Sequence, residues 1–386
     1  MAGREKNGCR KMVMFVEFQN TMTLFLCPTV PERMVAMNKY DERYEIRLAR
    51  KSDIDDIMRF IDEHWRKGHI MARDRKLFEY EYVDGDGDDV NFVLAIDRRT
   101  RSIEGVFGFL SCSRTTDPAR KDIWGSMWKV VDGRDNIPFL GVELARRVVA
   151  LTGCRTQIGT GANPKTTVPL RRMFFGDKTA RMKHYYLLNK DIDEYRIAVI
   201  RHRPDKRPRN DGLETNLLEL KSIDEVRKHF DIDSVGTIPY KDYWYINKRY
   251  FNHPYYRYTV YGLQDENGTT GALMMTRAVE CNGSKVLRIV DYFGDQRPFA
   301  GLGTAFEKII RENRYEYIDF YTHGFHEAYI LDAGFTLRTD NDPNIIPNYF
   351  EPFLRENVDI WVHYKYDNTL FFKADGDQDR PNQPRD

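Results

Sequence analysis

Apolar and polar residues follow two kinds of spacing between residues 41 and 195. Tyr44–Arg50 alternates as a strand does, and the apolar residues that follow it up to Trp65 recur at helical spacing. The pattern then predicts strands at 91–97, 103–111 and 122–131, a helix at 141–151, a strand at 155–159, a short helix at 170–175 and a strand at 183–189. This order predicts a mostly antiparallel sheet flanked by helices.

The same order of elements begins again after residue 215. The pattern predicts a strand at 216–220, a helix at 223–230, an aromatic helical segment at 240–251, strands at 255–263, 271–279 and 285–292, a helix ending at Asn313 and a strand at 317–321. A repeated order of elements indicates two copies of one plan. We therefore expect an α/β (α+β) fold of two tandem domains, 41–195 and 216–374, each a mixed, mostly antiparallel sheet flanked by helices.

Three segments lie outside these two domains. Residues 196–215 are rich in charge and proline and poor in apolar residues, which predicts a charged linker. Within residues 1–40, the fairly apolar stretch 12–30 is interrupted by polar residues and has neither the length of a membrane span nor a small-residue cleavage site. We therefore expect residues 1–40 to be a leader that is disordered or non-native. The polar tail, 375–386, has the aspartate spacing of a calcium loop without its glycine and glutamate, which favours solvated turns.

Composition excludes several classes of partner. The 386 residues include 60 Lys and Arg against 59 Asp and Glu, so the chain has no general attraction to nucleic acid or to an anionic membrane. We expect neither as a partner. The five cysteines form no CxxC pair, which argues against both a disulfide framework and a zinc site. We therefore expect no metal and a reducing, cytoplasmic location.

One segment of the second half has the pattern of a phosphate-binding loop. The strand at 285–292 leads through a Gly-containing loop into a helix, and such a helix start leaves backbone N–H groups unpaired. Gly301 and Gly303 allow the backbone to approach a phosphate closely, and Arg297 can add positive charge. The loop is therefore a candidate site for a phosphate or pyrophosphate.

Two segments resemble motifs of the Gcn5-related N-acetyltransferase (GNAT) fold, residues 290–303 and residues 329–335. The second segment ends with Ala-Gly-Phe. The first half resembles this fold more loosely, because its loop at 132–141 has no Gly-x-Gly. Tandem proteins in bacterial surface-polysaccharide gene clusters are similar. The resemblance implies acetyl-CoA or another acyl-CoA, with its pyrophosphate on the loop and its pantetheine arm entering where two neighbouring strands diverge.

The resemblance implies a cofactor site along one stretch of the second half. The expected cofactor-binding residues are Tyr292, Phe293, Arg297, Ala300, Gly301, Leu302, Gly303 and Thr304. The spacing departs from the family pattern, because Arg297 lies one residue further from Gly301 than the family's basic residue does. Pro298 occupies the usual basic position.

The proton of the acceptor amine needs a group to receive it, and three residues near this stretch are candidates. They are Asp291, His323 and Tyr329. A buried Asp291 would have a raised pKa and could act as a base, whereas an exposed one would face solvent or cap the following turn. Tyr329 lies one place before the position of the family's usual tyrosine.

Three functions are compatible with these features. The first is an acyl-CoA-dependent N-acyltransferase that moves an acetyl or acyl group to a small-molecule amine, such as an amino-sugar precursor of a surface glycan. The altered loop spacing and the displaced Tyr329 leave open a catalytically inactive binding or scaffold protein. Tandem relatives also transfer amino acids from charged tRNA, but the near-neutral charge argues against that activity.

Overall fold

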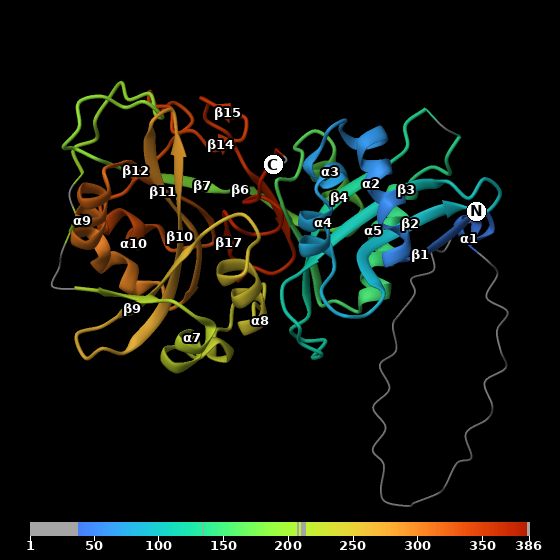
Figure 1. Cartoon of the computed structure of the whole chain (residues 1–386), viewed down its shortest axis with the longest axis horizontal. Coiled ribbons are helices and arrows are strands. Elements are labelled where there is room, and N and C mark those ends of the chain that lie inside the picture. The colour runs from blue at the N-terminus through green and yellow to red at the C-terminus, as the bar shows by residue number, and fades with distance from the viewer. Residues whose placement is uncertain (1–37, 134, 207, 210–213, 384–386) are drawn as a thin grey trace, which may run out of the picture. The chain divides into compact units, whose positions relative to one another are not determined.

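The computed structural model describes residues 38–133, 135–206, 208–209 and 214–383 (Figure 1). The expected leader, 1–40, lies outside the described residues except for its last three, of which Lys39 and Tyr40 begin the first helix. Residues 39–386 cluster as one compact unit.

Helices and strands follow the predicted order, with additional short elements. The first half contains α1 (Lys39–Arg43), β1 (Tyr44–Arg50), η1 (Lys51–Asp53), α2 (Ile54–Phe60), η2 (Ile61–Trp65), α3 (Ile70–Arg73), α4 (Arg75–Tyr82), β2 (Asp89–Asp97), β3 (Ile103–Ser111), β4 (Asp122–Val130), α5 (Leu140–Thr152), β5 (Thr156–Thr160), α6 (Thr167–Phe175), β6 (Lys178–Arg181) and β7 (Lys183–Leu188). The second half contains β8 (Asn216–Leu220), α7 (Ile223–His229), η3 (Ile232–Ser234), α8 (Tyr243–Ile246), η4 (Asn247–Phe251), β9 (Thr259–Gln264), β10 (Thr270–Cys281), β11 (Ser284–Gly294), η5 (Arg297–Leu302), α9 (Gly303–Asn313), β12 (Tyr315–His323), α10 (Glu327–Asp332), β13 (Thr336–Leu337), β14 (Tyr349–Phe350), β15 (Phe353–Leu354), β16 (Trp361–Tyr364) and β17 (Phe371–Phe372).

Two large mixed sheets organise these elements. The first sheet has the strand order β1-β2-β3-β4-β5-β16-β6, and the second has the order β13-β7-β12-β11-β10-β9-β8, with β17 added to β12. Each sheet contains one parallel pair, β4 with β5 and β11 with β12, and its remaining pairs are antiparallel. Helices flank both sheets (Figure 1). The predicted fold class, mixed and mostly antiparallel sheets with flanking helices, is confirmed.

Two strands cross from one half of the chain into the sheet of the other. The sequence assigns 183–189 to the end of the first domain, but β7 pairs with β12 in the second sheet, from Leu188 opposite Tyr317 to Lys183 opposite Thr322. In Figure 1, β7 lies among the strands of the second half. In return β16 joins the first sheet between β5 and β6. Alternating side chains predict a strand but not its partner, so this exchange could not be predicted from the local pattern.

One of the hydrophobic core clusters extends through both halves. It includes Trp124 of β4 and Phe293 of β11, and the aromatic segment 240–251 packs within it. The rings of Trp124 and Tyr245 are 5.3 Å apart, and the Tyr80 hydroxyl donates to the backbone oxygen of Lys248 at 2.8 Å. The aromatic residues of this segment therefore pack the two halves together.

The described part of the tail forms turns as expected, but the expectation that they are solvated is wrong. Asp375 and Asp379 are 0% and 2% exposed. Asp379 accepts from the Arg277 guanidinium at 2.6 Å, and the Lys241 amine lies 2.5 Å from Asp375. Burial of these carboxylates is possible because each has a cationic partner, which composition alone does not reveal.

A buried histidine of β7 makes the stability of the fold depend on pH. His184 is 1% exposed, stacks on the ring of Tyr321 and places Nε2 3.3 Å from Asp319 Oδ2. Burial lowers the pKa of His184 from 6.5 to about 4. Between these two values the unfolded chain binds a proton that the folded protein does not bind, so the free energy of unfolding should fall as the pH is lowered.

Urea unfolding at several pH values between 7 and 4 tests this expectation with His184→Gln, which can still donate to Asp319. The variant should lose stability less steeply than the wild type, by up to about 1.4 kcal/mol per pH unit, because it no longer takes up this proton on unfolding. His202→Gln removes an exposed histidine and should follow the wild-type slope. Equal slopes for wild type and His184→Gln would contradict the lowered pKa.

Candidate functional site

In the second half, the strands expected to admit a pantetheine arm do diverge, but the chain itself fills the gap. β11 and β12 pair in parallel from Lys285 to Ile289. Beyond this point β17 pairs with β12, and the backbone N–H of Ala374 donates to the oxygen of Val290 on β11 at 2.8 Å. A segment of this protein therefore occupies the position at which the resemblance places the arm.

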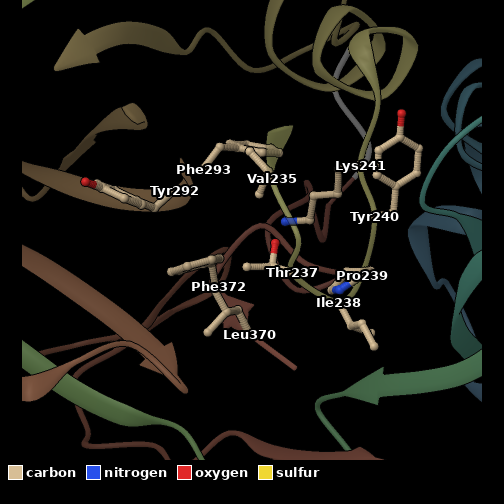
Figure 2. A pocket seen from close by; sticks show the side chains of 10 residues that line it. All are labelled: Val235, Thr237, Ile238, Pro239, Tyr240, Lys241, Tyr292, Phe293, Leu370 and Phe372. Atoms are coloured by element: carbon tan, nitrogen blue, oxygen red, sulfur yellow. The ribbon is translucent and has the colours of Figure 1, made fainter. Parts of the chain in front are cut away.

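Little space remains beside Tyr292 and Phe293, two of the expected cofactor-binding residues. Figure 2 shows the amine of Lys241 between Phe293 and Phe372, and it lies 5.2 Å and 5.6 Å from the centres of these rings. The cavity that remains has a volume of about 10 Å³. This volume is about that of a single water molecule.

The expected phosphate loop is also covered. It forms the 3₁₀ helix η5 and the start of α9, and a Cβ atom at Gly303 would collide with Pro208 of the linker. Gly301, Leu302 and Gly303 are buried, whereas Ala300 is partly buried and Thr304 is exposed. The guanidinium of Arg297 is exposed and pairs with Asp295, with Nη2 2.6 Å from Oδ2. The backbone of this loop is thus covered by the protein's own linker.

The three catalytic candidates lie on three different elements of the second half, β11, β12 and α10. Asp291 is fully buried and accepts from the Lys241 amine at 2.7 Å and from the Tyr250 hydroxyl, so it neither faces solvent nor lacks a partner. His323 lies at the end of β12, and burial lowers its pKa. Tyr329 is on α10. Within the described part of the chain, no hydrogen bond, ion pair or ring contact connects these three residues.

The equivalent strands of the first half diverge around an open cavity. β4 and β5 pair in parallel from Asp122 opposite Thr156 to Gly125 opposite Gly159 and then separate. The space beyond this point, here called the β4–β5 cavity, has a volume of about 430 Å³. It is lined by Trp65, His69, Phe107, Gly125, Ser126, Trp128, Gly159, Thr160, Gly161, Ala162, Asn163, Thr166, Thr167, Arg171, His363, Asp377, Gln378 and Arg380.

The exchanged strand β16 brings a histidine to the point where β4 and β5 separate. His363 pairs with Gly159 across the strands, and a Cβ atom at position 159 would collide with Nε2 of the imidazole. Glycine at this position therefore leaves the room that the ring needs. Nδ1 lies 2.9 Å from Asp177 Oδ2, and a donating Nδ1–H leaves the lone pair on Nε2.

Asp177 is itself held in place by a buried arginine. Arg171 of α6 is 1% exposed, donates Nε to Asp177 Oδ2 at 2.8 Å and donates Nη1 to Gln157 Oε1 at 2.5 Å. α6 ends at Phe175, and the φ of +65° at Gly176 turns the chain back so that the backbone N–H of Asp177 donates to the oxygen of Arg171. Burial, followed by the nearby Arg171, lowers the pKa of His363 from 6.5 to about 4. The imidazole is therefore neutral at pH 7, with the lone pair of Nε2 unprotonated.

The C-terminal tail forms one wall of the β4–β5 cavity. Ser126 directly follows Gly125, the last residue of β4 that pairs with β5, and donates Oγ to Asp377 Oδ2 at 3.2 Å. A Cβ atom at Gly161 would collide with the side chain of Gln378, so the tail lies directly against the end of β5. Sequence reasoning missed His363 and the tail. The local signal was the isolated glycine in each strand, which indicates a close approach by another group.

The described residues contain neither a metal-binding cluster nor a membrane-spanning helix. Within the described residues, no group of three or more His, Cys, Asp or Glu side chains is arranged to hold a metal ion. In the same part of the chain, no helix is both long enough and apolar enough to traverse a membrane.

Each half has the order of elements that the GNAT resemblance implies, with one parallel pair that diverges. No protein-family model and no curated protein matches the chain.

Three solved structures with similar folds are a GCN5-related N-acetyltransferase from Anabaena variabilis (TM-score 0.47, 9% identity, 83% of this chain and 72% of that one), a probable N-acyltransferase of unknown function from Enterococcus faecalis (0.49, 8%, 83% and 71%) and the Saccharomyces cerevisiae N-myristoyltransferase with bound myristoyl-CoA and inhibitors (0.43, 10%, 86% and 80%). At identities this low, no function is transferred from these proteins.

Proposed function

We propose that this protein transfers an acyl group from an acyl-CoA to a small-molecule amine, and that the reaction takes place in the β4–β5 cavity. One contrast between the halves supports this location. The gap between β11 and β12 is filled by β17 and Ala374, whereas the gap between β4 and β5 opens into about 430 Å³ of free space. Acyl-CoA is thus assigned to the first half and not to the loop at Gly301–Gly303.

The residues around the β4–β5 cavity suit an extended ligand with a charged end. Within the described residues, the edge of β4 beyond Gly125 has no partner strand on the side of β5, so its backbone can pair with the amides of a pantetheine arm. α5 begins after the end of β4, and the Trp128 indole donates to the oxygen of Gly141 in its first turn at 2.8 Å. The N–H groups of Leu140 and Glu143 donate to Ile137 and Phe139, so those of Gly141 and Val142 are the ones that we assign to a pyrophosphate.

In the proposed reaction, a side chain of this protein accepts the proton that the amine loses when it attacks the acyl group. The amine nitrogen attacks the thioester carbonyl carbon, the new C–N bond forms and the C–S bond breaks. Nε2 of His363 takes the proton that the amine loses and passes it to the departing thiolate. Asp177 orients the imidazole through Nδ1 and stabilises its protonated form, and Arg171 fixes Asp177.

Two finer parts of the proposal concern the acceptor and the location. We include an amino sugar among the acceptors, following the sequence resemblance, and glucosamine belongs in any panel of amines. We also keep the cytoplasm as the location, because the described cysteines, Cys112, Cys154 and Cys281, are all free thiols.

Matched substitutions in the two halves test the location of the acyl-CoA site. Thr167 is the first residue of α6 and lines the β4–β5 cavity, whereas Thr304 is in the first turn of α9, beside the expected loop. Thr167→Trp should weaken the binding of acetyl-CoA at least about tenfold, because the indole fills the cavity from its rim. Thr304→Trp should leave the affinity unchanged. Isothermal titration calorimetry measures both, with thermal unfolding as a check on folding.

Each other result points to a different function. An effect of Thr304→Trp alone would assign acyl-CoA to the second half. Binding of acetyl-CoA without thiol release in the presence of glucosamine and other amines would favour the binding or scaffold protein. Failure of the wild type to bind acetyl-CoA or a longer acyl-CoA would overturn the proposal.

A further inference from the structure

A second cavity adjoins the β4–β5 cavity across the C-terminal tail. It has a volume of about 350 Å³, and three tail residues, Asp377, Gln378 and Arg380, line both cavities. At the end of η2, the neighbouring residues Trp65 and Arg66 line one cavity each, Trp65 the first and Arg66 the second. The two spaces therefore adjoin along the tail and beside the end of η2.

This second cavity, here called the tail cavity, presents two guanidinium groups. Arg66 is exposed, and its side chain makes no hydrogen bond or ion pair with any described residue. Arg380 is 7% exposed and places Nη2 3.2 Å from Asp377 Oδ2, while its Nη1 has no partner among the described residues. Guanidinium groups with unused N–H donors bind carboxylates and phosphates well.

Carboxylates line the same cavity as the two arginines. Asp377 is one of the residues shared with the β4–β5 cavity, and Glu351 lines the tail cavity. A ligand that carries only negative charge would meet these carboxylates unfavourably. A ligand with an ammonium group at one end and an anionic group at the other would match both kinds of side chain.

We infer that the acceptor of the proposed acyl transfer is a small amine that also carries an anionic group, a carboxylate or a phosphate, and that Arg66 and Arg380 bind this group in the tail cavity. The inference rests on the proposed function. The amine would lie toward Asp377 and His363, at the point where β4 and β5 separate.

The position of the arginines favours the acceptor over the phosphates of CoA as the source of the anion. The tail contacts Ser126, directly beyond Gly125, where the two strands begin to diverge. The pyrophosphate of CoA is assigned instead to the start of α5. This helix comes after Val130, the last residue of β4. Arg66 and Arg380 therefore lie at the end of the site where the acyl group and the acceptor would meet.

Matched pairs of amines with and without an anionic group test the inference. Phosphoethanolamine is compared with ethanolamine, and glycine with glycinamide, by the release of CoA thiol from acetyl-CoA. The wild type should prefer the anionic member of at least one pair by about tenfold or more in kcat/KM, because a charged group in the tail cavity gains hydrogen bonds to arginine. Arg66→Gln should reduce this preference to near one, and Arg66→Lys should restore part of it.

Lys67→Gln is the matched control, because it removes the same charge from the next residue, which lines neither cavity. It should keep the preference. The inference is wrong if wild type treats both members of each pair equally, or if Arg66→Gln changes the affinity for acetyl-CoA, which would place the arginine on a CoA phosphate.

Direct binding of the anionic amines separates this inference from the proposed function. Saturation-transfer NMR with phosphoethanolamine and glycine, in the absence of acyl-CoA, should show binding to the wild type that Arg66→Gln abolishes. Binding of these amines without any binding of acyl-CoA would contradict the proposed reaction but support the anionic-amine site. Tight acyl-CoA binding together with no binding or turnover of either anionic amine would overturn the site alone.

Discussion

Replacing His363 with glutamine should lower kcat about 100- to 10,000-fold, which is the range for loss of a general base. The imidazole Nε2 lies at the β4–β5 cavity with its lone pair free, because Nδ1 is held by Asp177 at 2.9 Å. Glutamine has a similar size and keeps a polar group at the position, so the affinity for acetyl-CoA should change by less than about twofold. Steady-state kinetics with thiol detection and calorimetry measure the two quantities.

His323→Gln is the appropriate comparison for this variant. His323 is the histidine that the sequence favours as a catalytic candidate, and it lies at the end of β12 in the second half. A loss of kcat in His323→Gln with normal turnover in His363→Gln would show that the reaction takes place in the second half. Asp177→Asn provides an independent check, because it should lower kcat while the binding of acetyl-CoA remains, as expected for a residue that acts through His363.

Replacing Lys241 with methionine should lower the free energy of unfolding by about 3–5 kcal/mol, the cost of breaking a buried ion pair. The Lys241 amine lies 2.7 Å from Asp291 and 2.5 Å from Asp375, and all three side chains are almost fully buried. Burial alone would lower the pKa of Lys241, but the two carboxylates outweigh it and raise the pKa. The variant leaves both carboxylates without this cation.

Urea unfolding measures this loss, and two further variants make the result specific. Lys308→Met changes a side chain that is 70% exposed and should alter the stability by less than about 0.5 kcal/mol. Adding Asp291→Asn and Asp375→Asn to Lys241→Met should recover part of the loss, because neutral amides cost less to bury than unpaired carboxylates. A loss below about 1 kcal/mol in Lys241→Met would show that the pair contributes little.

The order of elements could be predicted from the sequence, whereas the partners of the elements could not. Alternation and helical spacing are local signals, so the strands at 103–111 and 285–292 and the helix ending at Asn313 are close to their observed limits. The strand 183–189 was also located correctly, but its partner, β12, is contributed by the other half of the chain. Pairing over such a separation leaves no trace in the spacing of either strand.

The site that we propose in the first half could not be predicted from the sequence for the same reason. Gly301 and Gly303 have the composition of a phosphate loop, and composition does not show that Pro208 lies against Gly303 or that β17 fills the gap between β11 and β12. In the first half, Gly159 carries no obvious motif. Its importance comes from His363, which reaches it only because β16 joins the first sheet.

The exchange of strands also ties the assembly of the site to the progress of synthesis on the ribosome. β5 is made early, but its neighbour β16 and the histidine on it emerge only after most of the second half has been translated. The tail at Asp377, which closes the cavity, emerges later still. A nascent or prematurely terminated chain therefore presents an incomplete first sheet with an open edge. In the proposed enzyme, acyl transfer could begin only in molecules whose translation had passed this point.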